Sequence, residues 1–182
     1  MGPRRSMRDA DCPYIAVCGP DPASEDAPAH AEHVGRLLAD AGAVVVCGGH
    51  GGVMEAVARG AADRGGTVVG ILPGADRREG NEHLTVRIAT GLGELRNALI
   101  VRTVDAVIAV SGGFGTLSEV ALALKTGVPV VGLDTWELSK AGRALDPDPI
   151  VRTATPEGAV REALRLAGAR TRARTEATGG PG

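Results

Sequence analysis

The predicted fold rests first on one segment of the sequence, Ala106-Val-Ile-Ala-Val110-Ser-Gly-Gly-Phe-Gly-Thr-Leu-Ser-Glu119. Its first five residues are all apolar, which is typical of a parallel strand covered on both faces. A glycine-rich loop follows at once, and residues 117–125 show the apolar spacing of a helix. A strand that passes through a glycine loop into a helix is the repeating unit of an open α/β sheet with helices on both faces.

Strand and helix patterns alternate along the rest of the chain with short connections, which imply right-handed crossovers. We expect strands at residues 14–18, 43–47, 67–72, 84–89, 106–110, 128–133 and, at an edge, 150–152. We expect helices at residues 30–41, 53–64, 92–103, 117–125 and 156–166. The predicted fold class is therefore α/β, a Rossmann-like doubly wound parallel sheet of six or seven strands with helices on both faces.

The length of 182 residues suits one domain. Residues 1–12 are polar and basic, and residues 169–182 consist of Arg, Thr, Ala, Gly, Glu and Pro without an apolar period. We therefore expect a single nucleotide-binding domain at residues 13–168, between a disordered N-terminal segment at 1–12 and a disordered tail at 169–182.

Composition excludes several classes of protein. The net charge is −2, so no basic excess is present to neutralise a nucleic-acid backbone. The aromatic residues are one Tyr, one Phe and one Trp, too few for base-stacking platforms along a single strand. No apolar run approaches the ~20 residues of a membrane span. Three cysteines suit a reducing compartment. We expect a cytoplasmic protein with no nucleic-acid or membrane partner.

Two glycine loops follow predicted strands at the edge of the sheet where ligands bind. The first contains Gly48, Gly49 and Gly52, and the second contains Gly112, Gly113, Gly115 and Thr116; Gly19 follows the first strand. Glycine lets backbone N–H groups approach an anion, and a helix N-terminus adds free N–H groups. The alternative is that these glycines only make tight turns. The loops lack the Walker ending and the dinucleotide fingerprint, so a phosphorylated mononucleotide-like ligand is favoured.

Two charged residues near the second loop have two interpretations each. Thr116 and Glu119 have the spacing of a capping box at a helix start. The alternative is that Glu119 presents a carboxylate one turn from a bound phosphate. Arg96, which lies in a helical pattern between apolar residues, is either a surface side chain or an anion clamp at the sheet edge.

The second loop, Ser111 to Glu119, resembles the Pro-Gly-Gly-x-Gly-Thr-x-x-Glu signature of the LOG (Lonely Guy) family, once called lysine decarboxylases. The first loop, with Met54 and Glu55 at its end, is similar to that family's other motif. The resemblance implies a phosphoribohydrolase, which cleaves the N-glycosidic bond of a nucleoside 5′-monophosphate. It also implies that Arg96 and Glu119 are catalytic, that the glycines, Thr116, Met54, Glu55 and Asn97 bind the ligand, that no metal or cofactor is required, and that the protein is a homodimer or larger homo-oligomer.

The sequence departs from that signature at two positions. Ser111 replaces Pro, and Asn97 replaces the Lys of an Arg-Lys pair. The Arg96-Asn97 pair and Glu55 are more similar to the branch of the superfamily that contains molybdenum-cofactor carrier proteins. The alternative function is therefore a non-catalytic carrier or sensor, with molybdenum cofactor or a nucleotide as the bound ligand.

Overall fold

The computed structural model describes residues 12–24 and 26–178. The disorder expected at residues 1–12 thus falls almost wholly outside the described residues, as does the end of the expected tail, 179–182. Within the described part, seven strands form one parallel sheet and helices cover both of its faces. This confirms the predicted α/β, doubly wound architecture.

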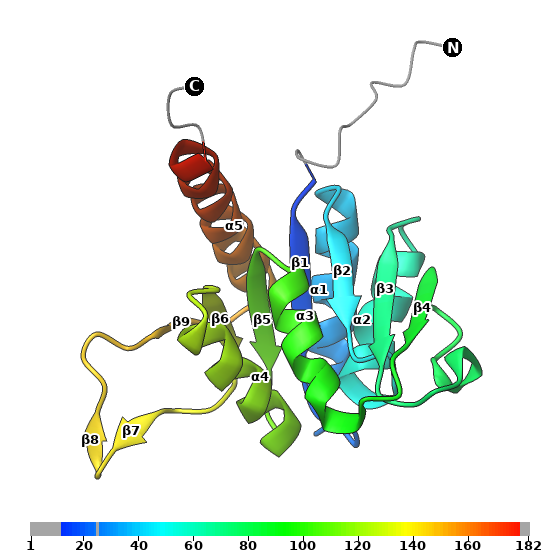
Figure 1. The fold of residues 1–182 in the computed structure, drawn as a ribbon, viewed down its shortest axis with the longest axis horizontal. Coiled ribbons are helices and arrows are strands. Elements are labelled where there is room, and N and C mark those ends of the chain that lie inside the picture. Colours follow the sequence, from blue (N-terminus) through cyan, green and yellow to red (C-terminus); the bar gives the residue numbers. More distant parts are fainter. Residues whose placement is uncertain (1–11, 25, 179–182) are drawn as a thin grey trace.

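The sheet has the order β4-β3-β2-β1-β5-β6-β9, and every neighbouring pair is parallel. Its strands are β1 (Tyr14–Cys18), β2 (Val44–Cys47), β3 (Val68–Leu72), β4 (Val86–Ala89), β5 (Ala106–Val110), β6 (Val130–Leu133) and β9 (Ile150–Thr153). All five residues of β5 are buried, as its wholly apolar pattern predicts. A two-stranded antiparallel hairpin, β7 (Ser139–Lys140) with β8 (Arg143–Ala144), projects from the connection between β6 and β9 (Figure 1).

Two helical layers sandwich the sheet (Figure 1). The helices are α1 (Ala27–Asp40), α2 (Gly52–Ala62), α3 (Asn97–Thr103), α4 (Phe114–Lys125) and α5 (Pro156–Thr178), with 3-10 turns η2 (Arg77–Glu79) and η3 (Gly93–Arg96). Apolar residues of α1, α2 and α5 share one core cluster, and those of α3 and α4 share the other. Side chains of β1 and β5 alternate between the two clusters, because successive strand residues point to opposite faces.

The strand order reverses between β1 and β5. From β1 the chain moves outward through β2, β3 and β4, and it then returns to place β5 on the other side of β1. The loops that leave these two strands therefore diverge, and a crevice opens between them at the carboxyl ends of the strands. Both glycine loops and the segment after β1 meet there.

Two sequence expectations about helices are wrong. The last helix does not stop near residue 166 but continues to Thr178, so most of the expected tail at 169–182 is helical. Arg170 helps to hold the extension, because its Nη1 donates to the carbonyl of Val104 at 2.8 Å. Of the helices in residues 12–24 and 26–178, none is both long and apolar enough to cross a membrane.

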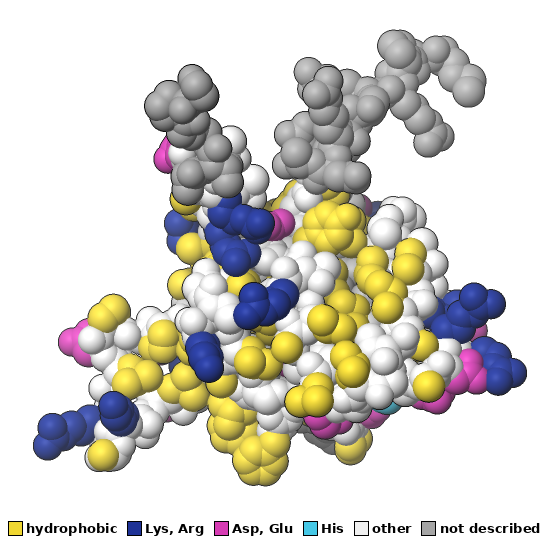
Figure 2. Space-filling view, viewed as in Figure 1, with side chains coloured by type: hydrophobic (Ala, Val, Ile, Leu, Met, Phe, Trp, Pro, Cys, Tyr) yellow, Lys and Arg dark blue, Asp and Glu magenta, His cyan; other side chains and the backbone are white. Residues whose placement is uncertain are grey.

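The apolar face predicted for residues 92–103 is not in the core. The segment is split into η3 and α3, and Leu95 is 77% exposed. Five exposed aliphatic residues come from β4, from the position just before η3, from η3 and from α3. We call this group the apolar patch, and it consists of Val86, Ile88, Leu92, Leu95 and Leu99. Figure 2 shows hydrophobic side chains gathered on this face of the molecule, over α3 and toward the edge of the sheet.

Candidate functional site

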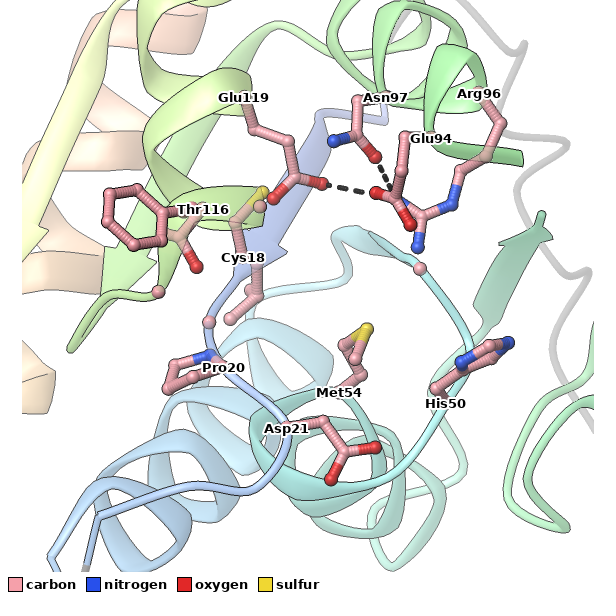
Figure 3. Close-up of a pocket in the computed structure, with 16 residues that line it drawn as sticks. Cys18, Pro20, Asp21, His50, Met54, Glu94, Arg96, Asn97, Thr116 and Glu119 are labelled. Atoms are coloured by element: carbon pink, nitrogen blue, oxygen red, sulfur yellow. Dashed lines mark hydrogen bonds and ion pairs between the residues drawn. The ribbon is translucent and has the colours of Figure 1, made fainter. Parts of the chain in front are cut away.

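A cavity of about 300 Å³ opens at the carboxyl ends of β1, β2 and β5 (Figure 3). This volume is at the lower end of the range for small-molecule sites. Its walls come from four segments: the end of β1 with the residues that follow it (17–21), the first glycine loop, the η3–α3 junction, and the start of α4. The predicted site residues that line it are Gly19, Gly48, Met54, Arg96, Asn97, Gly113, Gly115, Thr116 and Glu119.

The start of α4 supplies backbone donors to the wall of the cavity. Gly113 is the N-cap, so Phe114, Gly115 and Thr116 are the first three helical residues. Their N–H groups precede the first helical hydrogen bond, in which Leu117 N donates to the carbonyl of Gly113 at 3.0 Å. Thr116 is thus inside the helix rather than at its N-cap. The capping-box interpretation of Thr116 and Glu119 is therefore wrong.

Arg96 and Glu119 meet in the wall of the cavity. Arg96 Nη1 lies 3.7 Å from Glu119 Oε1, and each side chain is 9% exposed. Arg96 also donates through Nη1 to Oδ1 of Asn97 (Figure 3). The surface interpretation of Arg96 is thus excluded, because the guanidinium is buried with a carboxylate and an amide as partners.

Asn97 connects the arginine to the helix that carries the second loop. Its Nδ2 donates to Ser118 Oγ at 2.7 Å, and that hydroxyl donates to the carbonyl of Gly115 at 2.7 Å. A lysine at position 97 could not accept from Arg96, since an ammonium has donors only. The departure from the Arg-Lys pattern therefore creates a neutral bridge between η3 and α4.

The Glu119 carboxyl group titrates near neutrality. Burial raises the pKa of Glu119 to about 7, while the charge of Arg96 and a hydrogen bond from the Cys18 thiol act in the opposite direction. Burial also raises the pKa of Cys18 well above its usual range. Cys18 is consequently a neutral donor beside the carboxyl group, and Glu119 is poised to gain or lose a proton near pH 7.

Only part of the first glycine loop lines the cavity. Gly48 approaches the arginine so closely that a Cβ there would lie 2.6 Å from Arg96 Nη2. Gly52 has φ of +61° at the start of α2, a conformation that favours glycine. Gly49, Gly52 and Glu55 are absent from the cavity wall within the described residues.

Position 111 is incompatible with the proline of the LOG signature. Ser111 has φ of +56°, whereas the proline ring fixes φ near −65°. Its N–H also donates to the carbonyl of Leu133 at 3.0 Å, and proline has no N–H. Gly112, the next residue, does not line the described cavity wall, and a Cβ there would lie 2.5 Å from Trp136 Nε1.

Sequence reasoning missed several residues of the wall. Cys18 lines it as the last residue of β1, and Pro20 and Asp21 line it because they follow the carboxyl end of that strand. The rule that led us to the glycine loops applies equally to this strand end. His50, inside the first loop, and Phe114, inside the second, also line the cavity.

Among the described residues, three buried side-chain nitrogen or oxygen atoms have no hydrogen-bond partner in the protein. They are His50 Nε2, Arg96 Nε and Thr116 Oγ1, and all three residues line this cavity. An unpaired buried polar group costs roughly 1–3 kcal/mol. Their position around one cavity is consistent with a site for a polar ligand.

Comparison with known proteins identifies the family of this chain. Residues 12–160 match the SLOG cluster4 family. The chain belongs to this family. The SLOG superfamily also includes the LOG proteins, so the resemblance of the two glycine loops is confirmed at the level of the superfamily. A protein of Archaeoglobus fulgidus is 47% identical over 121 residues, which are 65% of this chain and 78% of that protein.

Two solved structures resemble this SLOG cluster4 protein over most of their length. The molybdenum cofactor binding protein of Rippkaea orientalis is 35% identical, with a TM-score of 0.78 over 88% of this chain and 99% of that one. The molybdenum cofactor carrier protein of Chlamydomonas reinhardtii is 32% identical, with a TM-score of 0.74 over 86% and 99%. These likenesses support a Rossmann-like ligand-binding protein.

Proposed function

We propose that this protein binds a phosphorylated, nucleotide-like ligand in the cavity and hydrolyses the N-glycosidic bond of a nucleoside 5′-monophosphate. The observation that carries the proposal is the set of unpartnered polar atoms of His50, Arg96 and Thr116, which surround one cavity. A phosphorylated sugar supplies the acceptors that Arg96 and Thr116 lack.

The phosphate is assigned to the start of α4. Phe114, Gly115 and Thr116 offer free backbone N–H groups. Thr116 is 2% exposed, and its hydroxyl has no hydrogen-bond partner in the protein. The helix adds a partial positive charge at the same end. A Cβ at Gly115 would meet no described atom within 4 Å outside its own neighbourhood, so the backbone there is open to an incoming anion.

Arg96 and Glu119 are assigned to the ribose and the bond that breaks. In the reaction, water adds to the anomeric carbon and the base leaves with a proton. Glu119 stabilises the positive charge that develops on the sugar, or accepts the proton of the attacking water. A carboxyl group with a pKa of about 7 is suited to proton transfer near neutral pH. Arg96 holds the carboxylate in place and contacts a polar group of the ligand. No protein-bound metal is needed for these steps.

A second candidate function is a carrier of molybdenum cofactor. It is favoured by the two molybdenum-cofactor proteins that resemble this chain and by Asn97 in place of lysine. That cofactor has a phosphorylated pterin, which presents the same two recognisable parts as a nucleotide: a phosphate for α4 and a flat ring. In this function Glu119 orients the ligand without a chemical step.

The apolar patch supports the proposal that the protein is a homo-oligomer. Exposed apolar side chains that gather on one face of a protein mark an interaction site. The patch adjoins the cavity through Leu95, which precedes Arg96 in η3. A second copy of the chain is the occupant we assign to it.

A thermal-shift screen tests the proposed function. Nucleoside 5′-monophosphates and pterin phosphates are compared with the same compounds lacking phosphate. Ligands that bind only the native state raise the melting temperature. Stabilisation by at least one phosphorylated compound supports the proposal. No stabilisation by any of them, at millimolar concentration, contradicts it. Release of free base, followed by chromatography, then separates the hydrolase from the carrier.

A further inference from the structure

Phe114 is exposed although the chain has only three aromatic residues. The side chain is 83% exposed, and it lines the cavity between Gly113 and Gly115. The core clusters are built mainly from Val, Leu, Ile and Ala, with Tyr14 packed at the edge of one. A phenyl ring held in water at a cavity contributes nothing to the core, so its position requires another explanation.

Trp136 lies beside this ring and is hydrogen-bonded to the same loop. The ring centroids of Phe114 and Trp136 are 5.7 Å apart with an interplanar angle of 38°. The indole N–H donates to the carbonyl of Gly113 at 3.1 Å, and Thr135 Oγ1 donates to the carbonyl of Ser111 at 2.5 Å. Phe114 therefore lines the cavity, and its ring contacts Trp136, which is hydrogen-bonded to the loop that presents the N–H donors.

We propose that Phe114, supported by Trp136, is a stacking platform for the flat heterocyclic ring of the ligand. This inference rests on the proposed function, because it takes the phosphate to be bound at the start of α4. An aromatic face attracts another ring through stacking, whichever heterocycle the ligand carries. The platform selects a phosphorylated heterocycle over a simple sugar phosphate that the same N–H groups would accept.

The position of Phe114 separates it from the apolar patch. The patch residues are aliphatic, and none of the five lines the described cavity wall. Phe114 is the first residue of α4, next to the N–H groups of Gly115 and Thr116. Its ring is therefore within reach of a group that is joined to the phosphate through one ribose.

The experiment compares ligands with and without a ring. We would titrate AMP, GMP and ribose 5-phosphate by calorimetry into the wild type and the variants Phe114→Leu and Phe114→Tyr. The wild type is expected to bind AMP or GMP more tightly than ribose 5-phosphate. Phe114→Leu is expected to weaken the nucleotide by about tenfold and ribose 5-phosphate by less than twofold. Phe114→Tyr, which keeps a ring face, is expected to retain the wild-type selectivity.

Three results would overturn the inference. In the first, Phe114→Leu weakens the binding of nucleotide and ribose 5-phosphate equally, or weakens neither. In the second, the wild type binds ribose 5-phosphate more tightly than the nucleotides. In the third, Phe114→Leu changes only the oligomer mass measured by sedimentation. In each of these cases phosphate-bearing ligands still bind and the proposed function stands. If the wild type binds none of the three compounds, both the proposed function and the platform are contradicted. The single tryptophan supplies a second readout, since a ring bound at Phe114 changes Trp136 fluorescence.

Discussion

Arg96 and Glu119 form an ion pair at 3.7 Å in the wall of the cavity, with each side chain only 9% exposed. The pair joins two segments that are separated by the whole of β5, so it depends on the tertiary fold. Removing one member of a buried pair leaves an uncompensated charge. The pair therefore serves the site by holding Glu119 at a defined place, next to the N–H donors at the start of α4.

Glu119→Gln is expected to preserve folding and ligand binding while base release falls by about 10²-fold or more. The substitution removes the carboxylate but keeps the shape of the side chain. The measurement is free base released from a panel of nucleoside 5′-monophosphates, separated by chromatography. Glu82→Gln, at a side chain that is 85% exposed, is the matched control and should leave release unchanged.

Two results would count against a catalytic Glu119. If Glu119→Gln releases base at the wild-type rate, the carboxylate takes no part in the reaction. If the wild type releases no base from any nucleoside monophosphate but still binds one, the carrier function is supported and Glu119 orients the ligand.

The stability of the protein is expected to fall as pH rises through the range set by Glu119. The pKa of this carboxyl is about 7 in the folded state against 4.5 ordinarily, so between these values the folded state holds a proton that the unfolded state has released. One pKa unit corresponds to about 1.4 kcal/mol. From pH 5 to pH 8, the free energy of unfolding should therefore drop by about 2 to 3 kcal/mol more in the wild type than in Glu119→Gln. Urea unfolding at the two pH values measures this, and parallel pH dependence of the two proteins would refute it.

Gly113→Val is expected to abolish ligand binding in a folded protein. Gly113 has extended backbone, with φ of −101°, and its Cβ would lie 3.6 Å from Pro20 Cβ, an ordinary contact. The effect is therefore steric: a branched side chain occupies the cavity beside the N–H donors. Thermal shift with AMP and GMP measures it. Gly168→Val, on α5, is the control and should leave ligand binding unchanged. If Gly113→Val binds the ligand with the wild-type affinity, the ligand lies elsewhere.

Leu95→Glu is expected to shift the oligomer toward the 18.4 kDa monomer, because a charge is placed on the most exposed residue of the apolar patch. Sedimentation velocity measures the mass. Leu145→Glu, at an exposed leucine outside the patch, should leave the mass unchanged. A wild-type protein that is monomeric at micromolar concentration would disprove the assignment of the patch to a second copy.

The strands and the place of the site could be predicted because they depend on local pattern. Apolar runs such as β5 identify buried parallel strands, and the topology of such sheets places ligands at the carboxyl ends of those strands. The two glycine loops therefore pointed to the edge of the sheet at which the cavity lies. The burial of Arg96 could not be predicted, because it depends on contacts with Glu119 and Asn97 that only the tertiary fold creates.

The wrong predictions share a physical cause. Thr116 and Glu119 have capping-box spacing, but Gly113 is the N-cap and α4 starts at Phe114, two residues before Thr116. Leu92, Leu95 and Leu99 recur at helical spacing, but their face points outward to the apolar patch rather than to the core. Periodicity shows that a face is apolar and does not show what covers it.

The most direct test of the central claim is the dependence of binding on phosphate. Calorimetry compares each nucleoside 5′-monophosphate that stabilises the protein with its own nucleoside, which has the same base and ribose. Because the N–H groups at the start of α4 and the Thr116 hydroxyl are assigned to the phosphate, the nucleoside should bind at least tenfold more weakly, or about 1.4 kcal/mol less favourably. Equal affinities for nucleotide and nucleoside would contradict the account.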